Sequence, residues 1–232
     1  LLGASTVRSC SGGLMRWKKD SPPTEELLRL MAASLRDEKP MLRDFGVVLA
    51  IETHFEFTSF ELLRLFDLCG AVPGEYLGIC LDTMNLLTML EDPVLATRRL
   101  LPWVVTTHIK DGGLMLAADG LVSFTAEAGK GAIDLAAIIE ALGAAHPHIT
   151  LTVEDHGGDF RIPVADAEFL ARFPDLAVPE LVGLLGISAR TRELMDAGKL
   201  AVLSRDRWPA VCEPRVKRDI QAVRRIFGRD GK

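Results

Sequence analysis

The sequence predicts an α/β protein whose core is a parallel β-sheet or barrel. Apolar runs of strand length alternate with stretches that show the apolar period of a helix, and this alternation implies right-handed crossovers between parallel strands. The runs are continuously apolar, as in strands that are covered on both faces. Several of them end in a side chain that can bind a metal, and chemistry in such folds collects at the carboxyl ends of the strands.

The bulk properties exclude several classes of protein. The 232 residues, 48% of them hydrophobic, suffice for one large or two small domains, and the net charge of −5 argues against a dedicated nucleic-acid binder. Four widely spaced cysteines without a CxxC pair favour a reduced, cytoplasmic protein. No apolar run reaches the roughly 20 residues of a membrane span, and nothing resembles a signal peptide. Because the chain opens on Leu1 without a methionine, we expect a fragment or part of a longer chain.

Five strands are expected, each bounded by turn or helix signals. Their positions are Leu1–Val7, Gly46–Ile51, Tyr76–Leu81, a stretch within Val104–Gly112, and Ile149–Val153. The fourth strand turns at its Asp-Gly-Gly sequence, and the segment Leu114–Lys130 after it is expected to be a loop.

Capping residues before apolar periods mark the expected helices. Helices are expected to start after Ser21, after Thr58 or Ser59, after Asp92 and after Asp134, with a kink or interruption at Pro40 in the first of them. The segment Gly129-Lys130-Gly131 has the wrong glycine spacing for a phosphate-binding loop, so we expect a tight turn there.

The tail of the chain is expected to be mostly helical, at Ala165–Phe173, Pro179–Leu200 and Glu213–Phe227. The last of these has an apolar face at helical spacing, with basic residues such as Arg215 and Arg218 over much of the remainder. We interpret the basic residues as the solvated face of a packing helix. A contact with phosphate or nucleic acid is the alternative.

Four metal-capable residues stand at the ends of four apolar runs. They are Glu52, Asp82, His108 and Glu154, at separations of about one βα unit, the last one longer. A single histidine at a strand end is usually structural, but four such residues at equivalent places would converge at one rim of the sheet. Three carboxylates and one imidazole make a mostly hard site that favours Mn²⁺ or Mg²⁺, with Co²⁺, Fe²⁺ and Zn²⁺ as alternatives.

The motifs around these residues resemble those of the xylose-isomerase-like TIM-barrel superfamily, in its sugar phosphate isomerase/epimerase branch. The matching pieces cover residues 1 to about 160 in the family's order: LAIETHFE (49–56), GICLDTMN (78–85), VVTTHIKDG (104–112), GKGAID (129–134) and LTVEDHGG (151–158). The resemblance implies that Glu52, Asp82, His108 and Glu154 match the family's four metal ligands.

The resemblance also implies an architecture. Family barrels are (β/α)8 barrels whose ligands lie on strands five to eight, so Leu1–Val7 would match strand four and strands one to three would be absent. Either the chain is cut, or the missing wall comes from elsewhere. We expect residues 1–162 to form the C-terminal part of the barrel with the metal site, and residues 163–232 to form a helical extension that packs on it.

The chemistry implied by the resemblance is isomerisation or epimerisation of a sugar or a sugar phosphate through a metal-stabilised cis-enediolate, and a keto acid is a further candidate substrate. Glu52 and Glu154 would act as the acid/base pair. His54 would bind a substrate hydroxyl or orient Glu52, and Asn85 would contact the substrate. Asn85 stands near where ketose 3-epimerases typically have a histidine, which argues against 3-epimerisation of free ketoses.

Two residues next to the metal histidine have different expected roles. Lys110 would neutralise an enolate or carboxylate of the substrate, with a solvated residue on the rim as the alternative. Asp111 would orient the metal ligands without binding the metal itself.

Three other functions compete with an isomerase. A lyase on the same scaffold would dehydrate a keto-polyol or decarboxylate a 3-oxo acid, and a degenerate barrel could be a non-catalytic binding protein. A DNA-repair endonuclease would need a site with several histidines and a basic face. This chain has five histidines in all and a negative net charge, which argues against that function. We therefore expect a small-molecule substrate, no nucleic-acid or membrane partner, and leave homo-oligomerisation open.

Overall fold

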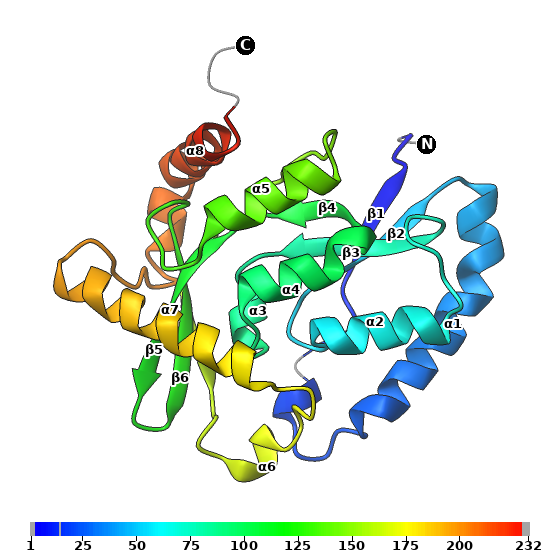
Figure 1. Ribbon diagram of the computed structural model, residues 1–232, viewed down its shortest axis with the longest axis horizontal. Coiled ribbons are helices and arrows are strands. Elements are labelled where there is room, and N and C mark those ends of the chain that lie inside the picture. The colour runs from blue at the N-terminus through cyan, green and yellow to red at the C-terminus, as the bar shows by residue number, and fades with distance from the viewer. Residues whose placement is uncertain (1–2, 14, 229–232) are drawn as a thin grey trace.

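The sheet at the centre of the fold has four parallel strands that follow one another in space as they do in the chain (Figure 1). The computed structural model describes residues 3–13 and 15–228. Its parallel strands are β1 (Thr6–Ser9), β2 (Val48–Glu52), β3 (Leu77–Asp82) and β4 (Val104–His108). The sheet curls as one side of a barrel does, which confirms the predicted α/β class.

Three of these strands lie where the apolar runs predict them, and two predictions need correction. The first strand was expected at Leu1–Val7, but β1 begins at Thr6, and residues 1–2 lie outside the described part. The expected strand Ile149–Val153 is reduced to a single parallel bridge between Ile109 and Val153. One reason is that the Thr152 N–H donates to the hydroxyl of Thr107, at 3.0 Å, instead of to a strand carbonyl.

Four helices follow one another along the parallel sheet, each in contact with the next. They are α1 (Thr24–Asp44), α2 (Ser59–Leu68), α4 (Pro93–Leu100) and α5 (Leu135–Ala145). The predicted caps Thr58, Asp92 and Asp134 all accept backbone N–H groups at the first turns, and Thr58 forms a capping box with Glu61. Two short elements complete this region: α3 (Asn85–Thr88) directly after β3, and the 3₁₀ turn Leu101–Trp103 before β4.

Helix α1 departs from two expectations. Ser21 is not its cap, because the helix begins only at Thr24, and Pro23 at its N-cap makes no side-chain capping bond. A residue before a proline is pushed out of the helical region, so Pro22 cannot continue the helix backwards from Pro23. Pro40 was expected to kink or interrupt the helix, but the helix runs on to Asp44. Pro40 is exposed, so the carbonyl that lacks its N–H donor can face solvent.

The segment expected to be a loop after β4 is a β-hairpin. Strands β5 (Asp111–Ala117) and β6 (Gly120–Ala126) pair antiparallel through the two residues Ala118 and Asp119, and β7 (Asp159–Ile162) pairs with β6. An Asp-Gly pair between two apolar runs is a hairpin signal, so the sequence carried this information. The hairpin begins at Asp111, shortly after β4 ends at His108.

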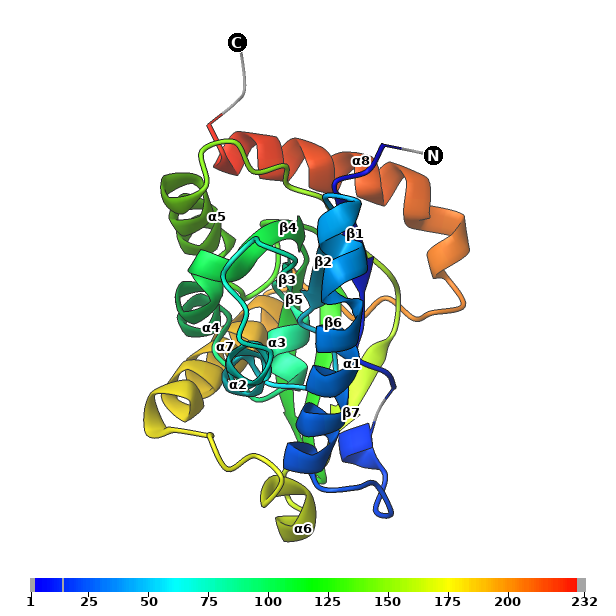
Figure 2. The ribbon, with the colours of Figure 1, turned by 90° about the vertical axis from the view of Figure 1, so that its right-hand side faces the viewer.

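Three helices follow in the tail, as expected: α6 (Ala167–Leu170), α7 (Val178–Asp196) and α8 (Trp208–Ile226). Helix α7 packs across β5, where the Thr191 hydroxyl accepts the Leu114 N–H at 3.0 Å. Helix α8 runs along one end of the molecule next to α5 (Figure 2). None of the described helices is long and apolar enough to cross a membrane. The four cysteines form no disulfide.

One continuous hydrophobic core joins the strands to these helices. Residues of β3 such as Ile79 and Leu81 are fully buried between helices and the rest of the sheet. They pack with Leu65 and Phe66 of α2 and with Ile138 of α5. Burial of β3 on both faces explains why its sequence is continuously apolar, and it fixes the sheet whose strand ends carry the candidate site.

Burial of one carboxyl group beside this core gives a test by pH. Glu91 is 2% exposed, accepts the N–H and hydroxyl of Ser59, and pairs with Arg99 at 3.1 Å. Burial raises the pKa of Glu91 to about 7, although the bonds from Ser59 oppose that rise. The folded state therefore holds this proton between pH 4.5, the ordinary pKa of a glutamate, and about pH 7, a range in which the unfolded chain has lost it.

We expect the free-energy contribution of Glu91 to folding to fall as the pH rises from about 4.5 to about 7. The free energy of unfolding of the natural protein minus that of Glu91→Gln should decline by up to about 1.4 kcal/mol per pH unit, as measured by urea denaturation across this range. Glu213→Gln, at a side chain 76% exposed, is the control and should leave the pH slope unchanged. A pH-independent difference for Glu91→Gln would contradict the assignment.

Candidate metal centre

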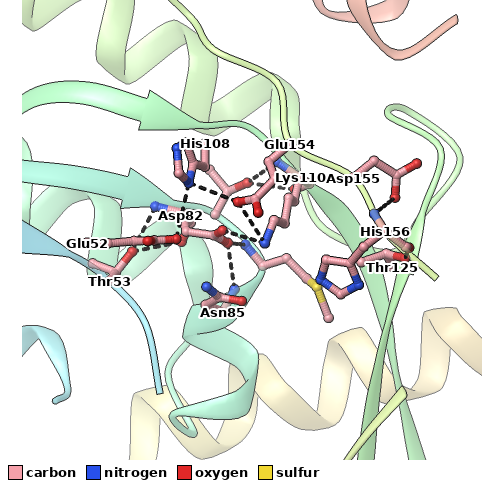
Figure 3. A network of polar contacts seen from close by, with 12 residues as sticks. Glu52, Thr53, Asp82, Asn85, His108, Lys110, Thr125, Glu154, Asp155 and His156 are labelled. Carbon is pink, nitrogen blue, oxygen red and sulfur yellow. Dashed lines mark hydrogen bonds and ion pairs between the residues drawn. The ribbon is translucent and has the colours of Figure 1, made fainter. Parts of the chain in front are cut away.

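The ends of three strands and the segment beside them bring the four predicted residues together. Glu52, Asp82 and His108 are the last residues of β2, β3 and β4, and the Glu154 N–H donates to the Ile109 carbonyl just beyond β4. One potential ligand atom from each of the four lies within 4.8 Å of the others (Figure 3). The predicted convergence is therefore present in the structure.

Hydrogen bonds from two threonine side chains hold the strand ends in register. The Thr53 hydroxyl donates to the Asp82 carbonyl at 3.0 Å and accepts the Asp82 N–H at 2.8 Å, which ties the end of β2 to that of β3. Thr83 makes the same exchange with the backbone of Lys110, at 2.6 and 2.9 Å. These side chains add hydrogen bonds between neighbouring strands at the point where the strands end. They fix the backbone that carries the acidic side chains.

Two basic side chains lie among the carboxylates. His108 Nδ1 lies 3.1 Å from Glu52 Oε1 and 2.9 Å from Glu154 Oε2. The ammonium of Lys110 lies 2.8 Å from Asp82 Oδ2 and 3.1 Å from Glu154 Oε2. Lys110 is only 5% exposed, so its interpretation as a solvated rim residue is wrong.

Asp82 is the most deeply buried member of the cluster, with no exposed surface. Its Oδ1 accepts the N–H groups of Met84 and Asn85 at 3.0 and 2.9 Å, which fixes the carboxylate plane. Its Oδ2 meets the ammonium of Lys110 as an ion pair, and Glu154 Oε2 meets both Lys110 and His108. A cation that binds these two oxygens would therefore displace or share the basic partners.

Proton affinities in the cluster follow from these contacts. Hydrogen bonds to Cys80, Glu154 and Glu52 raise the pKa of His108 to about 12. The bond from His108, with the ammonium of Lys110 acting in the same direction against burial, lowers the pKa of Glu154 to about 2. Burial raises the pKa of Asp82, opposed by Lys110. A metal-binding histidine must be neutral, so a cation that binds here displaces the His108 proton.

The donor set fits a hard divalent ion. Three carboxylates and one imidazole suit ions that prefer oxygen donors and accept a histidine, and one potential ligand atom from each lies within 4.8 Å of the others. Four protein ligands leave coordination positions for substrate oxygens. Glu52, Asp82, His108 and Glu154 would hold the ion.

The other predicted site residues divide between the cavity beside this cluster and its surroundings. His54 lines the cavity, but its Nδ1 bonds to Glu56 at 2.9 Å and not to Glu52. Asn85 also lines the cavity, and its buried Nδ2 has no partner among the described residues. The side chain of Asp111 accepts N–H groups of the 129–131 turn and makes no described bond to the four clustered side chains.

Asp111 organises the Gly129-Lys130-Gly131 segment. Its carboxylate accepts the N–H groups of Gly112, Gly129 and Gly131 at 2.8 to 2.9 Å. A Cβ at Gly131 would come 2.1 Å from Asp111 Oδ1, so only glycine fits there. The segment is the expected tight turn ahead of α5 and not a phosphate loop. Asp111 therefore ties the start of β5 to the turn ahead of α5, and its described bonds do not reach the metal candidates.

A cavity of about 240 Å³ opens beside the cluster and shows residues that sequence reasoning missed. Arg8, just before the end of β1, forms an ion pair with Glu52 at 3.0 Å, and the strand-end argument could have found it. The missed residues that line the cavity include Arg8, Phe55, His156, Phe160 and Arg205. A larger cavity of about 340 Å³ near the start of α1 contains none of the four clustered residues, so chemistry and not size selects the site.

Residues 1–173 match the xylose isomerase-like TIM barrel family. The chain belongs to this family. The parallel sheet with its helices is a partial barrel of the family's type, and the tail adds helices to it. Beyond residue 173 lie α7 and α8.

Several solved structures share this fold at low sequence identity. A xylose isomerase-like TIM barrel protein from Mycobacterium smegmatis in complex with magnesium is 15% identical, with a TM-score of 0.53 over 81% of this chain and 62% of that one. The IOLI protein with a binding zinc atom is 15% identical, with a TM-score of 0.51 over 87% and 66%. An L-ribulose 3-epimerase is 22% identical, with a TM-score of 0.51 over 85% and 63%.

A sequence relative, the uncharacterised protein YihM of Escherichia coli (strain K12), is 24% identical over 141 residues, or 60% of this chain and 42% of that protein. The chain thus spans less than two thirds of the length of each of these proteins.

The tail of this family member reaches the candidate metal centre through a buried ion pair. Arg215 of α8 binds the carboxylate of Asp155 through Nε and, at 3.2 Å, through its terminal nitrogen. Both side chains are less than a tenth exposed, and Asp155 is the neighbour of Glu154. The prediction that Arg215 belongs to a solvated face is therefore wrong, whereas Arg218 is half exposed as expected. Helix α8 holds the segment that carries the fourth ligand candidate.

We expect Glu154→Gln to weaken Mn²⁺ binding by at least about tenfold, because one of four donors loses its charge. Isothermal titration calorimetry on the metal-stripped protein measures this affinity. Asp159→Asn is the matched control, since Asp159 lines the same cavity outside the cluster and should leave the affinity unchanged. No stoichiometric binding by the natural protein, or equal affinities for all three proteins, would rule out the site.

We also expect Arg215→Met to destabilise the protein by on the order of 3 kcal/mol, because it leaves the Asp155 carboxylate buried and unpaired. Chemical denaturation measures the loss. Adding Asp155→Asn should recover part of it, so the double variant should be more stable than the sum of the two single changes predicts. Arg218→Met, at the exposed pair with Glu127, should cost much less. Strict additivity would show that Arg215 and Asp155 do not act together.

Proposed function

We propose that the chain is the metal-binding part of a divalent-metal-dependent sugar or sugar-phosphate isomerase/epimerase. The observation that carries this proposal is the position of Glu52 and Glu154, whose carboxylates contact the same His108 nitrogen from different elements at the edge of one cavity. Membership of the xylose isomerase-like family and the similarity of an L-ribulose 3-epimerase in fold support it.

Mn²⁺ or Mg²⁺ is the ion that we propose for Glu52, Asp82, His108 and Glu154. The carboxylate-rich donor set supports this choice over a structural zinc site, and a family member of the same fold has been solved with magnesium. When bound, the ion would polarise the carbonyl and an adjacent hydroxyl of the substrate and so acidify the proton on the carbon that bears that hydroxyl.

Glu52 and Glu154 are the proposed acid/base pair. A lowered pKa of about 2 keeps Glu154 ionised at neutral pH, so it can accept a proton from the substrate carbon. Glu52 is held from the other side by Arg8 and His108, which fixes its carboxylate against the cavity. Delivery of a proton by the second glutamate to the opposite face would invert the carbon, and delivery to the neighbouring carbon would isomerise the sugar.

Three further residues are proposed to bind the substrate. The Asn85 amide, unpartnered and buried in the cavity lining, can donate to a hydroxyl. His54 bonds through Nδ1 to Glu56, which leaves Nε2 to face a second hydroxyl. The Lys110 ammonium, beside Asp82 and Glu154, can stabilise negative charge on a substrate oxygen. Residues 163–232 are proposed to be a helical extension that braces this part of the barrel.

With Mn²⁺ in D₂O, we expect the protein to exchange carbon-bound protons next to the carbonyl of at least one member of a panel of ketoses, ketose phosphates and sugar keto acids. NMR spectroscopy follows the exchange. Glu52→Gln and Glu154→Gln should each slow it by on the order of a hundredfold or more, because each removes a proton carrier. Asp159→Asn should retain it.

The products of the same reactions separate the classes. Exchange with an intact carbon skeleton supports the isomerase, whereas release of water or CO₂ supports a lyase on the same scaffold. If metal binds but no panel member exchanges, the chain is not a catalyst for this class of substrate.

A further inference from the structure

Arg205 is a cavity-lining cation without a counter-charge. It lines the cavity together with Glu52, Glu154 and Phe160. Its guanidinium makes no hydrogen bond or ion pair with any residue in the described ranges. Arg8 and Lys110, two other basic side chains of the lining, already form ion pairs. Arg8 pairs with Glu52 at 3.0 Å, and Lys110 pairs with Asp82 and Glu154. Arg205 is thus the basic group in this lining that remains free for a ligand.

The backbone places Arg205 at the cavity by close packing. The Gly158 N–H donates to the Leu203 carbonyl at 2.7 Å. A Cβ at Gly157 would lie 2.7 Å from the Ser204 carbonyl oxygen and 3.1 Å from Arg205 Cα, so no side chain fits between the two segments. A Cβ at Gly158 would lie 3.2 Å from Arg205 Nε. The segment before α8 is therefore pressed against the loop that carries Glu154, with the guanidinium over Gly158.

The charge of the cavity favours an anionic ligand. Three carboxylates line the cavity, those of Glu52, Glu154 and Asp159, and Asp82 lies behind them in the cluster, against the three basic side chains of the lining. A divalent ion at the proposed centre brings the formal charge to +1 with neutral histidines. An anionic group on the ligand would neutralise that charge, and Arg205 is the place where it would meet a free donor.

The rest of the lining suits a small polyhydroxy compound. Phe55 and Phe160 stack on each other with centroids 4.9 Å apart and both line the cavity, which gives the ligand an apolar wall. The unpartnered Asn85 amide gives it a hydrogen-bond donor. The volume of about 240 Å³ lies below the range of about 300 to 1,000 Å³ that is usual for drug-sized ligands. One sugar-sized molecule fits these conditions.

We propose that the substrate carries an anionic group, a carboxylate or a phosphate, away from its reacting carbon, and that Arg205 binds this group. This inference rests on the proposed isomerase/epimerase function and narrows its substrate class. A guanidinium offers two parallel N–H donors that match both a carboxylate and a phosphate. Since Arg205 lies outside residues 1–173, the specificity comes from the tail and not from the family-matched part.

The test compares three substrates of matched carbon length: a neutral ketohexose, its 6-phosphate and a ketohexuronate. Deuterium exchange gives kcat and KM for each with the Mn²⁺-loaded natural protein and with Arg205→Ala, Arg205→Lys and Arg207→Ala. Arg207 is an exposed neighbour that does not line the cavity, so it is the matched control.

We expect the natural protein to prefer one of the anionic substrates over the neutral one. Arg205→Ala should remove that preference by raising KM for the anionic substrate on the order of tenfold to a hundredfold with little change in kcat. Arg205→Lys should restore part of it, and Arg207→Ala should change nothing. A preference for the 6-phosphate would identify the anionic group as a phosphate, and a preference for the ketohexuronate would identify it as a carboxylate. A preference that survives in Arg205→Ala, or a preference for the neutral ketose, would overturn the proposal.

Binding measurements separate this inference from the proposed function. Calorimetric titration of the Mn²⁺-loaded protein with the same two anionic compounds reports binding without turnover. Arg205-dependent binding without any exchange would refute the isomerase and leave the anion site standing. Exchange that does not depend on Arg205 would support the isomerase and refute the anion site.

Discussion

The buried carboxylate of Asp82 is the constraint on which the rest of this structure depends. It has no exposed surface, and an unpaired charge in such a place would cost several kcal/mol. Lys110 compensates for it at 2.8 Å, which in turn requires β3 and β4 to end side by side and explains why Thr83 locks the Lys110 backbone. The neighbouring carboxylates then gather around the same two cations. The cluster therefore forms one electrostatic unit, in which a divalent ion would have to displace or share existing partners.

Much of the parallel sheet and of the candidate site is readable from the sequence because both follow local periodicity. Glu52, Asp82 and His108 each end an apolar run, and the parallel crossovers place such ends together. Glu154 was placed correctly although its strand is only a bridge, because one backbone contact at Ile109 suffices to position it. The hairpin after β4 was missed because its Asp-Gly turn was read as loop composition.

The remaining errors concern contacts between segments far apart in the chain. Burial of Arg215 depends on Asp155, 60 residues earlier, and no local pattern on a helix distinguishes an arginine that finds such a partner from a solvated one. Lys110 could be read either way for the same reason, since its burial is set by Asp82 on the adjacent strand. Pro40 was misjudged because its effect depends on whether its side of α1 faces solvent. Tertiary context decides each of these cases.

The bond between Arg215 and Asp155 has a consequence for the order in which the protein is made. During synthesis the chain emerges N-terminus first, at a rate of about 5 to 20 residues per second. The segments that carry Glu52, Asp82 and His108 can pair as successive βα units before the tail exists. The loop that carries Glu154 gains its buried partner only when α8 has emerged and docked. A ribosome-bound chain that lacks α8 would hold three of the four ligand candidates in place, so capture of a metal ion would follow the docking of α8.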